Sequence, residues 1–219
     1  MLTQTDFAMQ SRHMENDWAS QNLQTIRLLM ERSSVYRRTL APIMVVTGGI
    51  GLTASIAALM LNLNSAVAFT IFWTATSFIS FISALLLVRR QALQDAEPFW
   101  SLPTRRVWQA LLPNFLVGFF AGLLFLLPDL AVSNKFWILP PVWMLFYGCA
   151  LHSAGFFMQR SIKMFGWVFV VMGLGVLIAD LVITRLQSAI ISHYVMGAFF
   201  GVLHLGFGIY LFCTEKTEK

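Results

Sequence analysis

Chemically active side chains are few in the apolar stretches of this chain, and two histidines are the first candidates. His152 and His204 fall in separate apolar segments that should run in the same direction, at similar depths. Two imidazoles at one level on different helices can ligate a haem, as in cytochromes built from helix bundles. Each imidazole can also hydrogen-bond to a backbone carbonyl or to Ser153. We expect this structural role, and a haem-binding redox subunit is an alternative.

A second candidate group lies toward the opposite end of these segments. Asp180 falls near the end of the fifth segment, His193 at the start of the sixth, and Arg185 between them. Ionisable side chains inside a membrane are costly and often mark proton or cation pathways. Asn114, in the third segment, adds a polar side chain that could line such a path. An Asp180–His193 or Asp180–Arg185 pair could then form a proton relay or a cation site, so a small transporter or channel is a second alternative. Snorkelling or a structural hydrogen bond explains the same residues, and we expect this structural role.

Motifs of soluble enzymes are absent. The chain has no phosphate-binding loop, no GxSxG nucleophile elbow and no HExxH metal motif. Its two cysteines, Cys149 and Cys213, have no CxxC or metal-ligand spacing. We therefore expect no enzymatic activity, no metal site and no cofactor apart from the haem of the first alternative.

The composition points to a membrane protein. Hydrophobic residues make up 58% of the 219 residues and charged residues 11%, and no Asp, Glu, Lys or Arg occurs between Arg38 and Arg89. A soluble fold needs more charge than this to cover its surface. The net charge is +5, but the basic residues flank the apolar segments, which is typical of membrane topology. We therefore expect no nucleic-acid partner.

Six apolar segments predict the fold class: an all-α, polytopic membrane protein with a bundle of six transmembrane helices. Each segment is near the ~20 residues that a helix needs to cross the hydrocarbon core, and no alternating barrel pattern appears. The bundle would occupy residues 40–213. The predicted spans are about 41–62, 66–88, 107–127, 136–157, 164–184 and 190–213.

The predicted N-terminal region has two parts. Residues 1–20 form a polar tail, and residues 21–39 form a basic amphipathic helix with Leu23, Ile26 and Met30 on one face. Such a helix before a membrane span is typical of the cytoplasmic headgroup surface, where its arginines contact anionic lipids. Residues 214–219 would form a short tail after the last span.

The basic residues predict the orientation. With the N-terminus in the cytoplasm, all of the 15 Lys and Arg residues lie on the cytoplasmic side except Lys135 and Arg185. Because cytoplasmic loops carry the excess of Lys and Arg, we expect both termini to be cytoplasmic.

Small residues at helical spacing predict where helices pack closely. Gly118 and Gly122 are four residues apart, as are Gly197 and Gly201, and Gly208 extends the second face. Such faces let helix backbones approach each other in a membrane. We expect packing within the chain, with a homodimer or another membrane protein as the alternative partner.

Several blocks of sequence resemble a family of small bacterial membrane proteins. These blocks are MERSSVYRRTLAPIMVVTGGIG at 30–51, FWSLPTRR at 99–106, PPVWMLFYGCAL at 140–151 and GAFFGVLHLGFGIYLF at 197–212. The resemblance implies six spans after a short juxtamembrane helix, in a bacterial inner membrane, and it supplies no known activity. We expect a non-enzymatic accessory or regulatory membrane subunit.

Overall fold

The computed structural model describes residues 18, 22–23, 40–94, 96, 99–100, 102–127, 135–183 and 187–217. All its regular elements within these ranges are helical, which confirms the predicted all-α class. The tail 1–20 and the amphipathic helix 21–39 lie outside the described residues, apart from Trp18, Asn22 and Leu23. Arg185 is outside them as well. These parts of the sequence stay predictions.

The helices follow one another with short connections. The last three elements form one continuous rod, in which a π-helical stretch separates two α-helical parts. The bounds are Leu40–Met60 for the first helix, Ala66–Gln94 for α2, Leu102–Leu124 for α3, Phe136–Ile138 for the 3-10 turn η1, Leu139–Ala154 for α5, Arg160–Val182 for α6, Ala189–Met196 for α7, Gly197–Leu203 for the π-helical η3 and His204–Thr217 for α8.

Five helices are long and apolar enough to cross a membrane, so the chain is a multi-pass membrane protein. They are Leu40–Met60, Ala66–Gln94, Thr104–Leu124, Arg160–Val182 and Ala189–Thr214. The predicted fourth span, 136–157, is not among them, because α5 has 16 residues and a full crossing needs ~20. The sixth span therefore stays a prediction.

Several helices extend beyond the apolar segments that predicted them. α2 continues through Arg89 and Arg90 to Gln94, α3 begins at Leu102 and α6 begins at Arg160. Helical hydrogen bonding does not stop where side chains become polar, so hydropathy marks the apolar surface and not the helix ends. The predicted connection 89–106 is correspondingly shorter in the structure.

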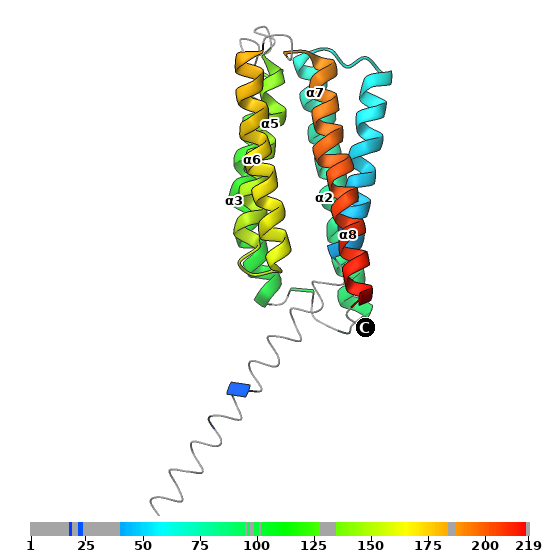
Figure 1. Ribbon diagram of the computed structural model, residues 1–219, viewed down its shortest axis with the longest axis vertical. Coiled ribbons are helices and arrows are strands. Elements are labelled where there is room, and N and C mark those ends of the chain that lie inside the picture. Colours follow the sequence, from blue (N-terminus) through cyan, green and yellow to red (C-terminus); the bar gives the residue numbers. More distant parts are fainter. Residues whose placement is uncertain are drawn as a thin grey trace, which may run out of the picture.

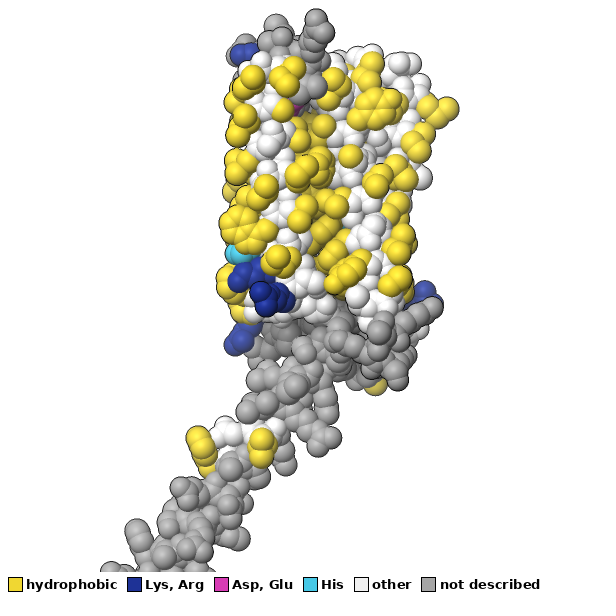
Figure 2. Space-filling view, in the orientation of Figure 1, with side chains coloured by type: hydrophobic (Ala, Val, Ile, Leu, Met, Phe, Trp, Pro, Cys, Tyr) yellow, Lys and Arg dark blue, Asp and Glu magenta, His cyan; other side chains and the backbone are white. Residues whose placement is uncertain are grey.

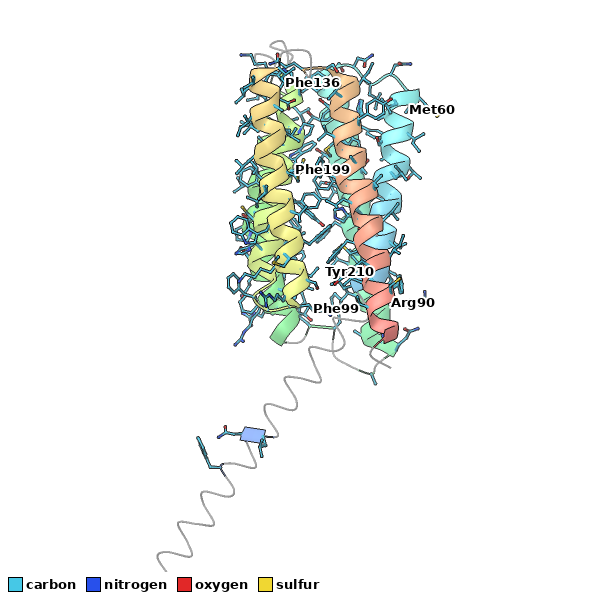
Figure 3. All side chains as sticks on the ribbon, in the orientation of Figure 1. Met60, Arg90, Phe99, Phe136, Phe199 and Tyr210 are labelled. Carbon is cyan, nitrogen blue, oxygen red and sulfur yellow. The ribbon has the colours of Figure 1, made fainter. Side chains whose placement is uncertain are left out.

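The helices stand side by side with their long axes nearly parallel (Figure 1). α3, α5 and α6 form one group, while the first helix, α2 and the α7–η3–α8 rod form the other. We name the two ends of the bundle by residues labelled in Figure 3: Met60 and Phe136 lie at the "Met60 end", and Arg90 and Phe99 at the "Arg90 end".

Glycines bring the first helix and the α7–η3–α8 rod into close contact. A Cβ atom added at Gly201 would lie 2.9 Å from the Cα of Leu52, and one at Gly208 would lie 2.9 Å from the backbone nitrogen of Val45. Gly197 faces the side chain of Ser55. The predicted glycine face of the last span thus packs against the first helix of the same chain.

The other predicted glycine face accommodates an aromatic ring. A Cβ at Gly122 would lie 3.0 Å from Cζ2 of Trp143 on α5, and the Gly118 carbonyl accepts a 2.9 Å hydrogen bond from Trp143 Nε1. A further close pair joins α5 and α6, where a Cβ at Gly148 would lie 2.7 Å from the Gly166 carbonyl oxygen. Tight backbone approach therefore occurs within each group of helices.

Two adjacent glycines test this packing. In Gly48→Ala the new methyl group would lie 2.6 Å from the Leu205 backbone nitrogen, whereas in Gly49→Ala it meets nothing within 4 Å. We expect Gly48→Ala to lower the free energy of unfolding by about 1–3 kcal/mol and Gly49→Ala to leave it unchanged or raise it slightly. Unfolding in mixed micelles by titration with a denaturing detergent measures both. Equal stability of the two variants would contradict the close contact.

Candidate functional site

His193 is fully engaged in hydrogen bonds near the Met60 end. Its side chain is 1% exposed. Its Nδ1 accepts a 3.0 Å hydrogen bond from Trp73 Nε1 on α2, and its Nε2 lies 3.0 Å from the carbonyl oxygen of Leu63, in the loop before α2. The Ser55 hydroxyl of the first helix donates to the His193 backbone carbonyl at 2.8 Å. His193 of α7 therefore forms hydrogen bonds to the first helix, to the loop that contains Leu63 and to α2.

Aromatic rings enclose the His193 imidazole. The Phe69 ring lies 5.0 Å from it, centroid to centroid, and Phe69 is itself flanked by Phe136 and Trp143. Because aromatic rings pack against the buried imidazole, its nitrogens depend on these two hydrogen bonds and not on water.

The expected Asp180–His193 pair does not form, since both His193 nitrogens have other partners. Asp180 lies in the last turn of α6 and is 4% exposed. Its backbone carbonyl accepts a 2.9 Å hydrogen bond from Gln187 Nε2. Asn114 lies near the middle of α3, half-buried, and makes no hydrogen bond with its side chain to any described residue. Among Asp180, His193 and Asn114, the three described residues of the predicted path, no side-chain hydrogen bond joins one to another, and the path stays a prediction.

His204 is the second fully engaged histidine. It is 2% exposed, and its Nδ1 lies 2.9 Å from the Phe199 carbonyl oxygen while its Nε2 lies 2.7 Å from the Tyr147 hydroxyl on α5. The rings of Phe165 and Phe169 on α6 lie 5.2 and 5.4 Å from the imidazole. The Tyr147–His204 hydrogen bond joins α5 to α8 and so connects the two groups of helices. Aromatic rings surround this contact.

A local distortion of the helix positions this histidine. η3, the π-helical stretch Gly197–Leu203, ends directly before His204. π-helical turns are wider than α-helical turns and are frequent at functional sites. Here the imidazole of His204 bonds the carbonyl of Phe199, five residues earlier in the chain. The distortion thus supplies an acceptor for a side chain that would otherwise be buried with one free nitrogen.

The two histidines considered for haem ligation lie on opposite sides of α6. The His204 ring contacts Phe165 and Phe169, whereas the His152 ring lies 5.3 Å from that of Trp167. At 100° per residue, Trp167 projects about 180° away from the mean direction of the two phenylalanines. The two imidazoles thus contact different sides of α6. This arrangement does not favour joint ligation, and the haem hypothesis stays a prediction.

The sequence reasoning missed Tyr147 and the partners of His193. A tyrosine or tryptophan deep in a membrane helix has an N–H or O–H that needs an acceptor, so Trp73 and Tyr147 were signals for nearby acceptors. Within the described parts of the chain, no three His, Cys, Asp or Glu side chains come close enough together to hold a metal ion.

Comparisons with protein-family models, with curated proteins and with solved structures found no match to this chain.

Hydrogen-bond partners define the tautomer of each buried histidine. Because the Leu63 and Phe199 carbonyls can only accept, the proton belongs on Nε2 of His193 and on Nδ1 of His204. We expect ¹⁵N-imidazole NMR spectra of the protein in lipid to show two neutral histidines of opposite tautomer. The variants His193→Gln and His204→Gln assign the signals. Two signals of the same tautomer would contradict these hydrogen bonds.

Removal of the Tyr147 hydroxyl tests the link between the two groups of helices. Tyr147→Phe keeps the ring and leaves Nε2 of His204 without a donor, so we expect the free energy of unfolding to fall by about 1–2 kcal/mol. Tyr210→Phe is the control, because Tyr210 is 56% exposed. The same detergent titration measures both variants. A Tyr147→Phe protein as stable as Tyr210→Phe would show that the Tyr147–His204 hydrogen bond adds nothing to stability.

Proposed function

We propose that the chain is a non-enzymatic accessory or regulatory subunit embedded in the inner membrane of a bacterium. The observation that carries this proposal is the state of the two buried histidines. Both nitrogens of His193 and both nitrogens of His204 are used by hydrogen bonds that fasten helices together. Groups used in this way hold a scaffold together and are not free to bind a substrate or a metal.

We further propose six spans, with α5 as the fourth. η1 and α5 follow one another directly, with 3 and 16 residues, and together they are about 30 Å long at the rises of 3-10 and α-helices. This length equals the thickness of the hydrocarbon core of a bilayer. α5 also stands alongside α3 and α6 within the bundle (Figure 1). This position supports the proposal that η1 and α5 alone cross the membrane.

The charge distribution supports cytoplasmic termini. Lys and Arg side chains gather at the Arg90 end of the described surface (Figure 2). Lys135 directly precedes Phe136, which lies at the Met60 end (Figure 3). The end of α8 also lies at the Arg90 end (Figure 1). Because the cationic end of a membrane protein faces the cytoplasm, we propose this orientation for the Arg90 end. The cations that support it are Arg89, Arg90, Arg105, Arg106, Arg160 and Lys163.

One observation favours a second candidate function, a small proton or cation transporter. Asp180 is 4% exposed within a helix that is long and apolar enough to span a membrane. A buried carboxylate at such a place is a common element of ion pathways. A transport function makes Asp180 indispensable for flux, whereas a scaffold tolerates its replacement by Asn.

Reconstitution of the purified full chain separates these functions. If the chain is an accessory subunit, proteoliposomes should show no proton or potassium flux above that of empty liposomes. Chemical cross-linking in native membranes should join the chain to one defined partner, either a second copy or another membrane protein. The purified protein should be colourless in its visible absorption spectrum.

Three results would overturn the proposal. A flux that Asp180→Asn abolishes would establish the transporter. A haem absorption band lost in His152→Ala would establish the redox subunit. A protein that stays monomeric and uncross-linked in native membranes would remove the partner on which an accessory role depends.

A further inference from the structure

The turn that joins α5 to α6 presents basic and aromatic side chains together at the Arg90 end. Lys163 Nζ lies 3.7 Å from the centroid of the Phe156 ring. The His152 ring packs edge-on against Phe156 at 5.4 Å and against Trp167 at 5.3 Å, centroid to centroid. Lys or Arg and His side chains lie next to each other near this end of the surface (Figure 2). We call this set, with Arg160 and Met164, the hairpin surface.

Close backbone packing fixes the geometry of the hairpin surface. A Cβ at Gly155 would lie 2.8 Å from the Cα of Lys163, and one at Gly166 would lie 2.6 Å from the backbone nitrogen of His152. These glycines let the end of α5 and the start of α6 touch at two levels. The side chains of His152 and Lys163 therefore project from a rigid support and not from a mobile loop.

One stripe of α6 carries the cationic part of this surface. Arg160, Lys163 and Trp167 are spaced by three and four residues, which places them on the same side of the helix. Among the side chains that the structure describes, the only carboxylate is that of Asp180, which is about 30 Å away at the far end of α6. The cations of this stripe thus have no acidic partner among the described residues.

The same surface exposes large apolar side chains. Phe156 is 65% exposed, Met164 57% and Trp167 50%. Exposed apolar groups next to cations at the end of a membrane helix match the boundary between headgroups and acyl chains. The His152 Nδ1 atom is buried there and has no hydrogen-bond partner among the residues that the structure describes.

From this combination we propose that the hairpin surface binds the headgroup of an anionic phospholipid. The phosphate lies between Arg160 and Lys163, and the acyl chains run along Trp167 and Met164. Charge complementarity selects an anionic lipid over a zwitterionic one, because the negative headgroup meets at least two cations that have no carboxylate beside them among the described side chains. A soluble anion would use the cations but would leave the aromatic and thioether side chains without a partner.

Native mass spectrometry of the full chain in detergent, titrated with phosphatidylglycerol or with phosphatidylcholine of the same acyl chains, tests the proposal. We expect the wild-type protein to bind the anionic lipid about tenfold more tightly. The double variant Arg160→Gln/Lys163→Gln should lose about tenfold of its affinity for phosphatidylglycerol. The charge-retaining variant Arg160→Lys/Lys163→Arg should keep most of this affinity.

The matched control is Arg89→Gln/Arg90→Gln, which removes two exposed cations from the same end of the bundle at α2. We expect it to keep its affinity within about twofold. An equal loss in the site and control variants would overturn the proposal, because it would show a general attraction to the basic end. Equal binding of the two lipids, or full competition by glycerol phosphate, would overturn it as well.

A second measurement does not depend on the folding of charge variants. Phosphatidylglycerol brominated on its acyl chains should quench the fluorescence of the wild-type protein more strongly than brominated phosphatidylcholine does. This excess should disappear in Trp167→Phe, because the proposed site places the acyl chains against Trp167. An excess that survives in Trp167→Phe would place the anionic lipid elsewhere and overturn the proposal.

Discussion

Apolar surroundings cannot satisfy a polar atom, and this constraint governs the interior of the bundle. The imidazoles of His193 and His204 each meet it with one acceptor and one donor, whereas the buried Thr70 hydroxyl has no hydrogen-bond partner among the described residues. His193 uses the Leu63 carbonyl and Trp73 Nε1, and His204 uses the Phe199 carbonyl and the Tyr147 hydroxyl. A helix that slid or rotated would break such a pair without water to replace it. The hydrogen bonds therefore set the register of helices that apolar packing alone would leave free to shift.

Glycine contacts complement these hydrogen bonds. In a lipid environment apolar side chains gain little by leaving the lipid, so helices associate through close packing and polar contacts. Gly48 and Gly201 bring the first helix against η3, and Gly148 and Gly166 bring α5 against α6. Each group of helices is thus joined internally by backbone approach, while aromatic rings and the Tyr147–His204 hydrogen bond connect the groups.

Hydropathy predicted the all-helical class and five of the spans. It could do so because the thickness of the hydrocarbon core sets how many consecutive apolar residues a spanning helix needs. It did not predict helix ends such as Gln94, since polar residues continue a helix beyond the apolar surface. The search for glycines four residues apart missed the contact of Gly148 with Gly166, which depends on two different helices. The partners of His193 were equally hidden, because Leu63 and Trp73 are far from it in sequence. Residue types indicated which groups needed partners, but only the three-dimensional packing determines which partners they find.

The α7–η3–α8 rod makes both kinds of contact, glycine packing and buried hydrogen bonds. Its glycines contact the first helix, His193 contacts α2 and its preceding loop, and His204 contacts α5 and α6. The π-helical stretch between the two histidines adjusts the rotation of α8 relative to α7, so that both rings can reach their partners. A regular α-helix through the same residues would turn the second imidazole away from one of its present partners. A helix held at so many points suits a fixed scaffold better than an element that moves during each cycle of transport.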